Sequence, residues 1–389
     1  RLEEKPSKDT KTEAEKMIIP LATSPLALAL VKSHTVIEID ARALVKTYGG
    51  TIKDVPTEFW DWIISLRPAA VWIKAVWERS LFSERFMQYC SQYHKEQGVK
   101  RIASGFDVNR YRLDPNIARD KAEFKEVTEY LANHDIKTIL DLVTNHIAVD
   151  SPEILRVPGL VYSWNGLKHY IKHTRRIISD KTAGLSDEVL GSWLDDEFRY
   201  KAFFRLNSGT NPRIVAHARQ GPFDAFMINL AQINYMSKSG RSFMLDTALR
   251  EIADLTLCGG VRLDLAFTAL RKHIFDCWAW LKGISAERFY KKIMPQEFLK
   301  EFMEHGKANF PGMINIAEVY EWPGKENTPW LGRSGNLQEF GFITYNKLFY
   351  DLIRAGNIAL LRDYLFMKPE VPAFLRKSIH FVEDHDEPP

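Results

Sequence analysis

The stretch 259–267 places two opposite charges inside a run of apolar residues. If this stretch is a strand, alternation puts Arg262 and Asp264 on one side and the apolar residues between and around them on the other. An arginine two residues before an aspartate can hold the carboxylate ionised and oriented, because a guanidinium keeps its charge. This pattern is typical of a nucleophilic aspartate, and a structural ion pair at the end of a barrel strand explains it equally well.

Length and composition limit what the chain can be. Its 389 residues exceed one ordinary domain and suit a large α/β barrel with an insertion. Hydrophobic residues make up 45% and charged residues 26%, which is typical of a soluble globular protein. The net charge is only +3 and no long basic run occurs, so a nucleic acid is not expected as the main partner. No run approaches the ~18 apolar residues of a membrane span.

The cysteines and the first residues bear on the compartment. Cys90, Cys258 and Cys277 are odd in number and lack metal-ligand spacing, so we expect reduced thiols and a cytoplasmic location. Residues 1–33 begin with a charged stretch and continue with an apolar one that contains prolines. We expect a mobile tail and a packed lead-in, not a signal peptide. Because the chain starts with arginine, its N-terminus is expected to be incomplete.

Strand and helix patterns alternate along most of the chain. Helical periodicity occurs at 56–66, 121–133, 242–255, 287–305 and 346–355. Strand-like runs occur at 35–40, 70–76, 137–143, 260–265, 313–319, 340–344 and 378–382. Such alternation favours a parallel sheet with helical crossovers, as in a TIM-type (β/α)8 barrel. Seven strands are one short of closure, so we expect a barrel that is incomplete at the C-terminus.

The alternation of strand and helix patterns is interrupted in one long segment, 147–240. It is rich in glycine, proline and tryptophan, and a structureless loop of that length is rare in a compact domain. We therefore expect a small inserted subdomain after the third strand. The expected organisation is a lead-in over 1–33, a first part of the barrel over 34–146, the insertion over 147–240, and a second part of the barrel over 241–389.

Four of the strand-like runs end in ionisable or polar groups. These are Asp141, Asn145 and His146 at the third strand, Arg262 and Asp264 at the fourth, Glu318 at the fifth, and His385 and Asp386 at the seventh. Parallel strands bring such ends to one rim, where active sites of barrels assemble. Burial alone does not select these residue types, so the set indicates a site.

Paired carboxylates suit the cleavage of glycosidic bonds. A retaining mechanism uses one carboxylate as nucleophile and another as general acid and base, ~5–5.5 Å apart. Asp264, next to Arg262, is the better nucleophile. Glu318 is flanked in sequence by alanine and valine, and such apolar surroundings would keep the proton that an acid must donate. Taken alone, Glu318 is equally well explained as the cap of a neighbouring helix.

The stretches 141–146, 260–264, 316–318 and 381–386 resemble, in this order, the four signature regions of the α-amylase family of glycoside hydrolases. The resemblance implies a catalytic (β/α)8 barrel and a retaining glycosidase. It assigns Asp264 as the nucleophile, Glu318 as the acid and base, and Asp386 as the group that holds the sugar hydroxyls and stabilises the transition state.

The resemblance also implies residues that bind substrate or metal. The residues expected at the sugar or its rim are Asp141, His146, Arg262 and His385, together with Phe106, which stands where many members of the family stack a tyrosine on the sugar. Asn145 occupies a position that often binds calcium, although a local cap or turn explains it equally well. The family's Lys-His pair after the nucleophile is missing, so calcium is only an option and no cofactor is required.

Two functions follow from this interpretation. The first is a hydrolase or transglycosylase that acts on α-glucosidic linkages of glucans or oligosaccharides. The second is a glycan-binding relative, or a fragment, that keeps the fold without turnover, because an unclosed barrel exposes unpaired strand edges. A metal-dependent hydrolase fits less well, since no zinc-ligand spacing occurs. The sequence defines neither the linkage preference nor the oligomeric state.

Overall fold

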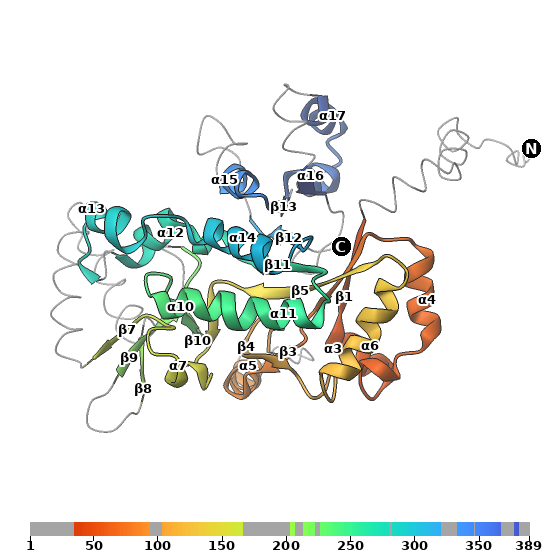
Figure 1. Ribbon diagram of the computed structural model, residues 1–389, viewed down its shortest axis with the longest axis horizontal. Helices are drawn as coiled ribbons and strands as arrows, with labels where there is room; N and C mark the ends of the chain where they lie inside the picture. Colours follow the sequence, from red (N-terminus) through yellow and green to blue (C-terminus); the bar gives the residue numbers. More distant parts are fainter. Residues whose placement is uncertain are drawn as a thin grey trace, which may run out of the picture.

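The computed structural model describes residues 35–93, 103–165, 203–206, 213–221, 226–279, 282–319, 333–345, 347–366 and 377–380. Their centre is a curled sheet of seven parallel strands in chain order (Figure 1). The strands are β1 (Val36–Asp40), β2 (Ala70–Lys74), β5 (Lys137–Val143), β11 (Gly260–Asp264), β12 (Ile314–Ala317), β13 (Ile343–Tyr345) and β14 (Ser378–Ile379). Each overlaps one of the seven expected strands, which confirms an incomplete barrel: among the described residues no strand joins β14 to β1.

Alternation along these strands divides their side chains between two cores. Inward residues pack with one another inside the curl, among them Ala70, Trp72, Ile139 and Ile316. The outward residues of the same strands join the larger core beneath the helices. At the start of β11, a Cβ on Gly260 would lie only 2.7 Å from Cγ1 of Ile139, so glycine lets the neighbouring strands approach.

Helices cover the outside of the sheet. The α-helices are α3 (Ala41–Tyr48), α4 (Thr57–Ser65), α5 (Leu81–Tyr93), α6 (Lys121–Ala132), α7 (Glu153–Arg156), α10 (Lys238–Ser242), α11 (Arg250–Leu255), α12 (Arg271–Ile274), α13 (Ala286–Arg288), α14 (Phe298–Asn309), α15 (Arg333–Phe340), α16 (Lys347–Arg354) and α17 (Ile358–Phe366). Helices α6 and α11 pack on β5 and on each other. Asp120 caps α6 by accepting a hydrogen bond from the N–H of Glu123, and Phe124 and Leu131 are buried on its inner face.

Short 3-10 and π-helical segments extend several of these helices. They are η1 (Ile52–Asp54), η3 (Phe243–Leu249), η4 (Ala266–Ala269), η5 (Phe275–Ala279) and η7 (Phe289–Ile293). The π-helical η3 joins α10 to α11, so the helix expected over 242–255 forms as one run.

Two expected elements are wrong in detail. The helix expected over 287–305 is two pieces: α13 with η7 ends at Ile293, and α14 starts at Phe298. Pro295 explains the break, because proline has no N–H to donate and disfavours helical backbone at the residue before it. The strand expected over 340–344 starts later, at Ile343, because α15 continues to Phe340 and Gly341, at φ 109°, ends it.

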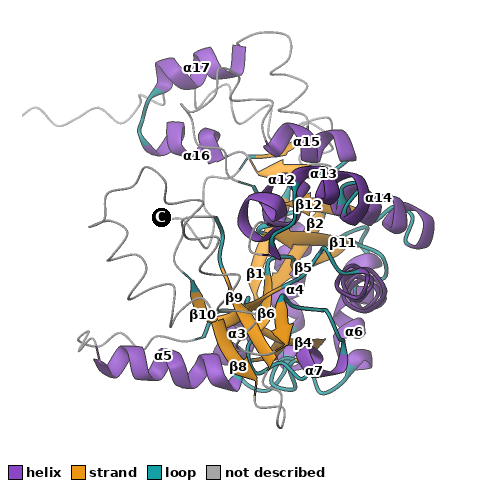
Figure 2. Ribbon diagram, turned by 90° about the vertical axis from the view of Figure 1, so that its left-hand side faces the viewer, coloured by secondary structure: helices purple, strands orange, loops and turns teal. Residues whose placement is uncertain are grey.

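A second, antiparallel sheet leaves the barrel directly after β5. It contains β6 (His146–Ala148), β10 (Met227–Gln232), β9 (Arg213–Ala218), β7 (Ser163–Asn165) and β8 (Phe203–Leu206), and lies at the lower left of Figure 1. It occupies the place where we expected an inserted subdomain, and the boundaries 147–240 stay a prediction. A separate two-stranded antiparallel sheet pairs β3 (Trp77–Arg79) with β4 (Val108–Leu113). Helix α5, which lies between them in the chain, contacts β10 and is seen at the lower left of Figure 2.

The expected tail and lead-in, 1–33, lie outside the described residues. In the part of the chain that is described, no helix combines the length and the apolar character needed to cross a bilayer.

Candidate active site

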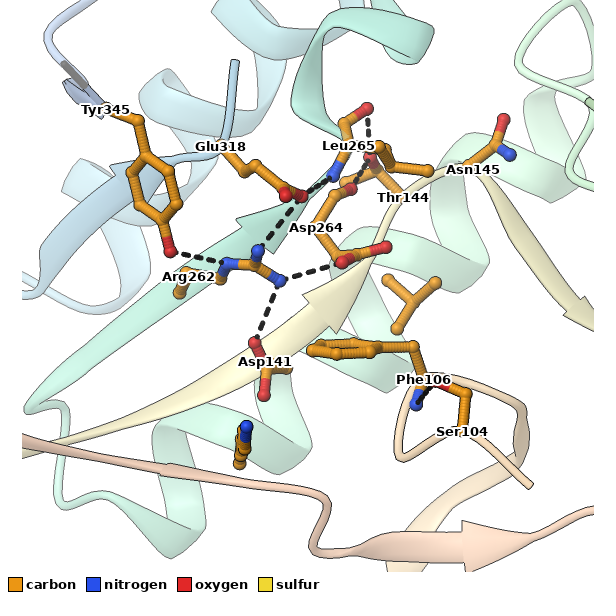
Figure 3. A network of polar contacts seen from close by, with 12 residues as sticks. Ser104, Phe106, Asp141, Thr144, Asn145, Arg262, Asp264, Leu265, Glu318 and Tyr345 are labelled. Atoms are coloured by element: carbon orange, nitrogen blue, oxygen red, sulfur yellow. Dashed lines mark hydrogen bonds and ion pairs between the residues drawn. The ribbon is translucent and has the colours of Figure 1, made fainter. Parts of the chain in front are cut away.

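The guanidinium of Arg262 is the centre of the site. Its Nη1 lies 2.8 Å from Oδ1 of Asp264 and 3.3 Å from Oδ1 of Asp141, and its Nη2 lies 2.9 Å from Oε2 of Glu318 (Figure 3). The three carboxylates come from β11, from β5 and from the residue after β12, and all are buried. The expected convergence of Asp141, Arg262, Asp264 and Glu318 at the carboxyl ends of neighbouring strands is therefore present in the structure.

The backbone at the end of β11 also holds Glu318. The N–H of Leu265 donates a hydrogen bond of 2.6 Å to Oε2 of Glu318, the same oxygen that faces Arg262. Leu265 has φ 47° and ψ 44°, a left-handed conformation that is rare for a leucine, at the point where the chain leaves β11. The apolar surroundings expected for Glu318 from its sequence neighbours are wrong, because alanine and valine point away from the strand face that carries it.

Three carboxylates around one cation create an excess of negative charge. With all of them ionised, one positive and three negative charges would leave the cluster at −2. Burial works against the charge of Arg262, but the surrounding acidic groups, Glu318 foremost, raise its pKa well above the usual value. The cluster thus combines a firmly charged guanidinium with three buried carboxyl groups.

Three aromatic rings also lie close to the guanidinium. Its central carbon lies 4.9 Å from the ring centre of Trp72, 5.2 Å from that of Phe106 and 5.6 Å from that of Tyr345. Such rings attract a cation through their faces and keep water away from it. Phe106 is half-buried and lies at the site, as expected, and its stacking on a sugar stays a prediction.

Hydrogen bonds fix the strand ends that carry the cluster. The hydroxyl of Thr144 donates to the carbonyl of Asp264 at 2.6 Å, and the hydroxyl of Tyr235 donates to the carbonyl of Thr144 at 2.6 Å. The indole N–H of Trp77 donates to the carbonyl of Asp141 at 2.8 Å. Trp77 is buried and supports β5.

His146 lies beside the cluster, and its two ring nitrogens contact Phe106 and Asn145. One ring nitrogen is 3.3 Å from the carbonyl of Phe106, and the other is 3.4 Å from the amide nitrogen of Asn145. Burial lowers the pKa of His146 to about 4, with Asp107 acting against this shift. Burial likewise raises the pKa of Asp107, and His146 opposes that. The imidazole is thus neutral near pH 7, and its contact with a sugar stays a prediction.

The side chain of Asn145 is engaged with protein groups. Its Oδ1 accepts a hydrogen bond of 3.0 Å from Nε2 of Gln232, which also donates to the carbonyl of Asn145 at 2.7 Å. Among the described residues no three His, Cys, Asp or Glu side chains gather as metal ligands would. The side chain of Asn145 thus holds Gln232 at the edge of the site, and calcium binding at Asn145 stays a prediction.

Two expected site residues, His385 and Asp386, lie outside the described residues. The structure in turn places residues at the site that the sequence interpretation missed: Trp72, Asp107 and Tyr345. Alternation from Ala70 along β2 would have placed Trp72 inside the barrel. Tyr345 lies one residue beyond the strand that we expected, and an uncharged ring there gives no signal of its own.

Comparisons of the sequence find no matching family model and no matching curated protein. Comparison with solved structures finds the fold in a noncanonic maltogenic α-amylase from Thermotoga neapolitana, with a TM-score of 0.52 and 16% identity over 92% of this chain and 61% of that one. For a sucrose 6F-phosphate phosphorylase from Thermoanaerobacter thermosaccharolyticum the TM-score is 0.51, with 16% identity over 87% of this chain and 58% of that one. For an α-glucosyl transfer enzyme the TM-score is 0.50, with 14% identity over 85% of this chain and 58% of that one.

This chain spans about three fifths of the length of these proteins. At 14–16% identity the likeness concerns the fold. The described part of the chain therefore has the fold of the α-amylase-type barrels, with its ionic cluster at the carboxyl ends of the parallel strands.

Proposed function

We propose that this chain carries the catalytic barrel of a retaining glycosidase or transglycosylase that acts on α-glucosidic linkages. The observation that supports this best is the pair Asp264 and Glu318, held 2.8 Å and 2.9 Å from two nitrogens of one guanidinium. Carboxylates that share one guanidinium lie close together, which favours the ~5–5.5 Å spacing of retaining enzymes over the ~6.5–9.5 Å of inverting ones. The structural neighbours, named as an amylase, a phosphorylase and a glucosyl transfer enzyme, fit the same chemistry.

In the proposed first step Asp264 attacks the anomeric carbon while the bond to the leaving oxygen breaks. Glu318 gives its proton to that oxygen, so the leaving group departs as a neutral alcohol and the sugar stays on Asp264 as a β-glucosyl ester. Because Oε2 of Glu318 already accepts from Leu265 and faces Arg262, the proton would reside on Oε1. Asp386 is proposed, from the resemblance alone, to hold the sugar hydroxyls.

In the second step Glu318, now ionised, takes a proton from water or from a sugar hydroxyl, which attacks the ester and releases Asp264. The ionised Glu318 is then stabilised by Arg262 and by the N–H of Leu265. The same contacts that hold Glu318 thus support the second step, while the excess of negative charge supports the protonated acid of the first.

The test uses the protein at its natural length with malto-oligosaccharides and with an aryl α-glucoside that has a good leaving group. Asp264→Asn should abolish turnover of both substrates, by about 10⁴-fold. Glu318→Gln should lower the turnover of the oligosaccharide as much as Asp264→Asn does. It should lower the turnover of the aryl glucoside far less, because a good leaving group needs no proton. Both variants should melt within a few degrees of the wild type. Equal losses of Glu318→Gln on both substrates would contradict its role as the acid.

A glycan-binding relative without turnover is the second candidate. It is favoured by the pairing of Glu318 with a guanidinium and an N–H, since both contacts stabilise the ionised form and not the acid. Calorimetry with maltotriose separates the two: binding by the wild type without release of reducing sugar selects this candidate, and turnover excludes it.

A further inference from the structure

One donor of Arg262 has a partner that carries no formal charge. While Nη1 and Nη2 face carboxylates, Nε donates a hydrogen bond of 3.2 Å to the hydroxyl of Tyr345 (Figure 3). Nε carries a single N–H that lies in the plane of the guanidinium, so a partner at Nε constrains the rotation of that plane. The contact with Tyr345 therefore adds a constraint to those that Asp264 and Glu318 place on Nη1 and Nη2.

The sheet explains how Tyr345 reaches this position. Ile316 of β12 is in register with Ile343 of β13, and Tyr345 follows two residues later on the same face. It thus stands level with Glu318, at the carboxyl end of the neighbouring strand. From there its side chain extends past Glu318 to Arg262, which lies on the next strand but one.

A tyrosine hydroxyl suits this place better than a further acidic group. Three carboxylates already surround the guanidinium, and a fourth would add to the repulsion between them. Tyr345 is 4% exposed, and its ring centre lies 5.6 Å from the central carbon of the guanidinium, so the same side chain supplies both an acceptor and an aromatic wall.

We propose that Tyr345 is a positioning residue: by accepting from Nε it sets the plane of Arg262, and through Arg262 the relative placement of Asp264 and Glu318. This inference rests on the function proposed above. Because the hydroxyl of Tyr345 acts through Arg262, its effect is expected on the chemical step and not on the binding of substrate. Removal of the hydroxyl leaves the ring, the barrel interior and all three carboxylates in place.

The experiment compares Tyr345→Phe with Tyr130→Phe, which removes a hydroxyl that contacts Asp61 on the outer surface. Tyr345→Phe should lower kcat about tenfold and change KM less than about twofold, because one hydrogen bond to a charged group is lost away from the substrate. In an Arg262→Lys background, which lacks Nε–H, the same substitution should cause no further loss. Tyr130→Phe should match the wild type in both constants.

A second readout does not depend on activity. The Nε–H resonance of Arg262, identified by its disappearance in Arg262→Lys, should shift and exchange faster with solvent in Tyr345→Phe than in Tyr130→Phe. An unchanged resonance, or an equal loss of kcat with and without Arg262, overturns the positioning role. If the wild type turns over no α-glucoside, the proposed function fails on its own, and the resonance still decides the role of Tyr345.

Discussion

The inside of the barrel sheet has two layers of opposite character. The lower layer is apolar and consists of packed side chains such as Ala70, Ile139 and Ile316. The upper layer, one alternation further along the same strands, holds Asp141 and Glu318 together with the rest of the ionic cluster. A step of two residues along a strand thus leads from an apolar side chain to an ionisable one.

The two layers differ in what holds them together. Burial of apolar surface stabilises the lower layer, at roughly 25 cal/mol per Å². In the upper layer, charges are taken out of water, and Leu265, whose N–H donates to Glu318, has a left-handed backbone. If the upper layer carries the proposed reaction, substitutions in the two layers should separate stability from activity.

The largest effect is expected from Arg262→Met, which leaves three buried carboxylates without their cation. We expect a loss of ~3–5 kcal/mol in the free energy of unfolding, together with loss of activity. Urea titration measures the first and release of reducing sugar the second. Arg271→Met is the matched control, since Arg271 pairs with Glu297 at 3.2 Å in a partly exposed place. A loss below about 1 kcal/mol for Arg262→Met would mean that the cluster is not the electrostatic unit described here.

The next effect depends on pH and concerns His146. Because burial lowers its pKa to about 4, from an ordinary value of ~6.5, the unfolded chain takes up a proton first as the pH falls. The stability supplied by the neutral imidazole is therefore complete above pH ~6.5 and is lost as the pH falls toward 4, by up to ~3 kcal/mol.

His146→Gln should remove this part of the acid sensitivity, measured by urea unfolding at a series of pH values. His217, whose pKa burial also lowers to about 4, contributes with the same sign, and Asp107, whose pKa is raised, contributes with the opposite sign. His217→Gln in the second sheet is thus the matched control. A wild-type slope that persists in His146→Gln but disappears in His217→Gln would contradict the assignment.

A smaller effect should mark the lower layer. Ile139→Val removes one buried methylene and should cost about 1 kcal/mol of stability with kcat within about twofold of the wild type. Asp141→Asn, two residues further along the same strand, should change the melting temperature little. It should lower kcat about tenfold, since Nη1 of Arg262 loses a charged partner. Similar losses of kcat in both variants would show that the two layers are not separable.

The smallest effect is expected on the surface. Glu287 and Lys291 form a pair at 3.0 Å, with both side chains more than 70% exposed. Glu287→Gln should change the free energy of unfolding by less than about 0.5 kcal/mol, because water screens such pairs. A larger change, seen by the same urea titration, would mean that water does not screen this exposed pair as expected.

The sequence predicted the barrel strands and the residues on their inner face better than it predicted the contacts between side chains. Alternation in β11 was enough to place Arg262 and Asp264 on the inner face, and apolar runs of strand length located all seven barrel strands. These features depend on residues close in sequence, where the periodicity of a strand determines which side chains share a face.

Details that depend on tertiary contact were not predictable in the same way. Flanking residues suggested an apolar environment for Glu318, whereas its partners are Arg262 of β11 and Leu265, the residue after β11, both more than fifty residues earlier in the chain. Tyr345 carries no charge and follows the end of the expected strand, so only the register between β12 and β13 shows its place. Helix α3 was missed because it starts immediately after β1, with Asp40 as its cap.

The central claim is that Asp264 and Glu318 meet on Arg262 to form and resolve a glucosyl-enzyme ester. Its most direct test is to incubate the protein with a slowly hydrolysed, fluorine-substituted α-glucosyl fluoride, digest it, and locate the label by mass spectrometry. We expect one sugar on the peptide that contains Asp264, absent in Asp264→Asn and longer-lived in Glu318→Gln. A label on another residue, or turnover of the reagent without any covalent adduct, would contradict this account.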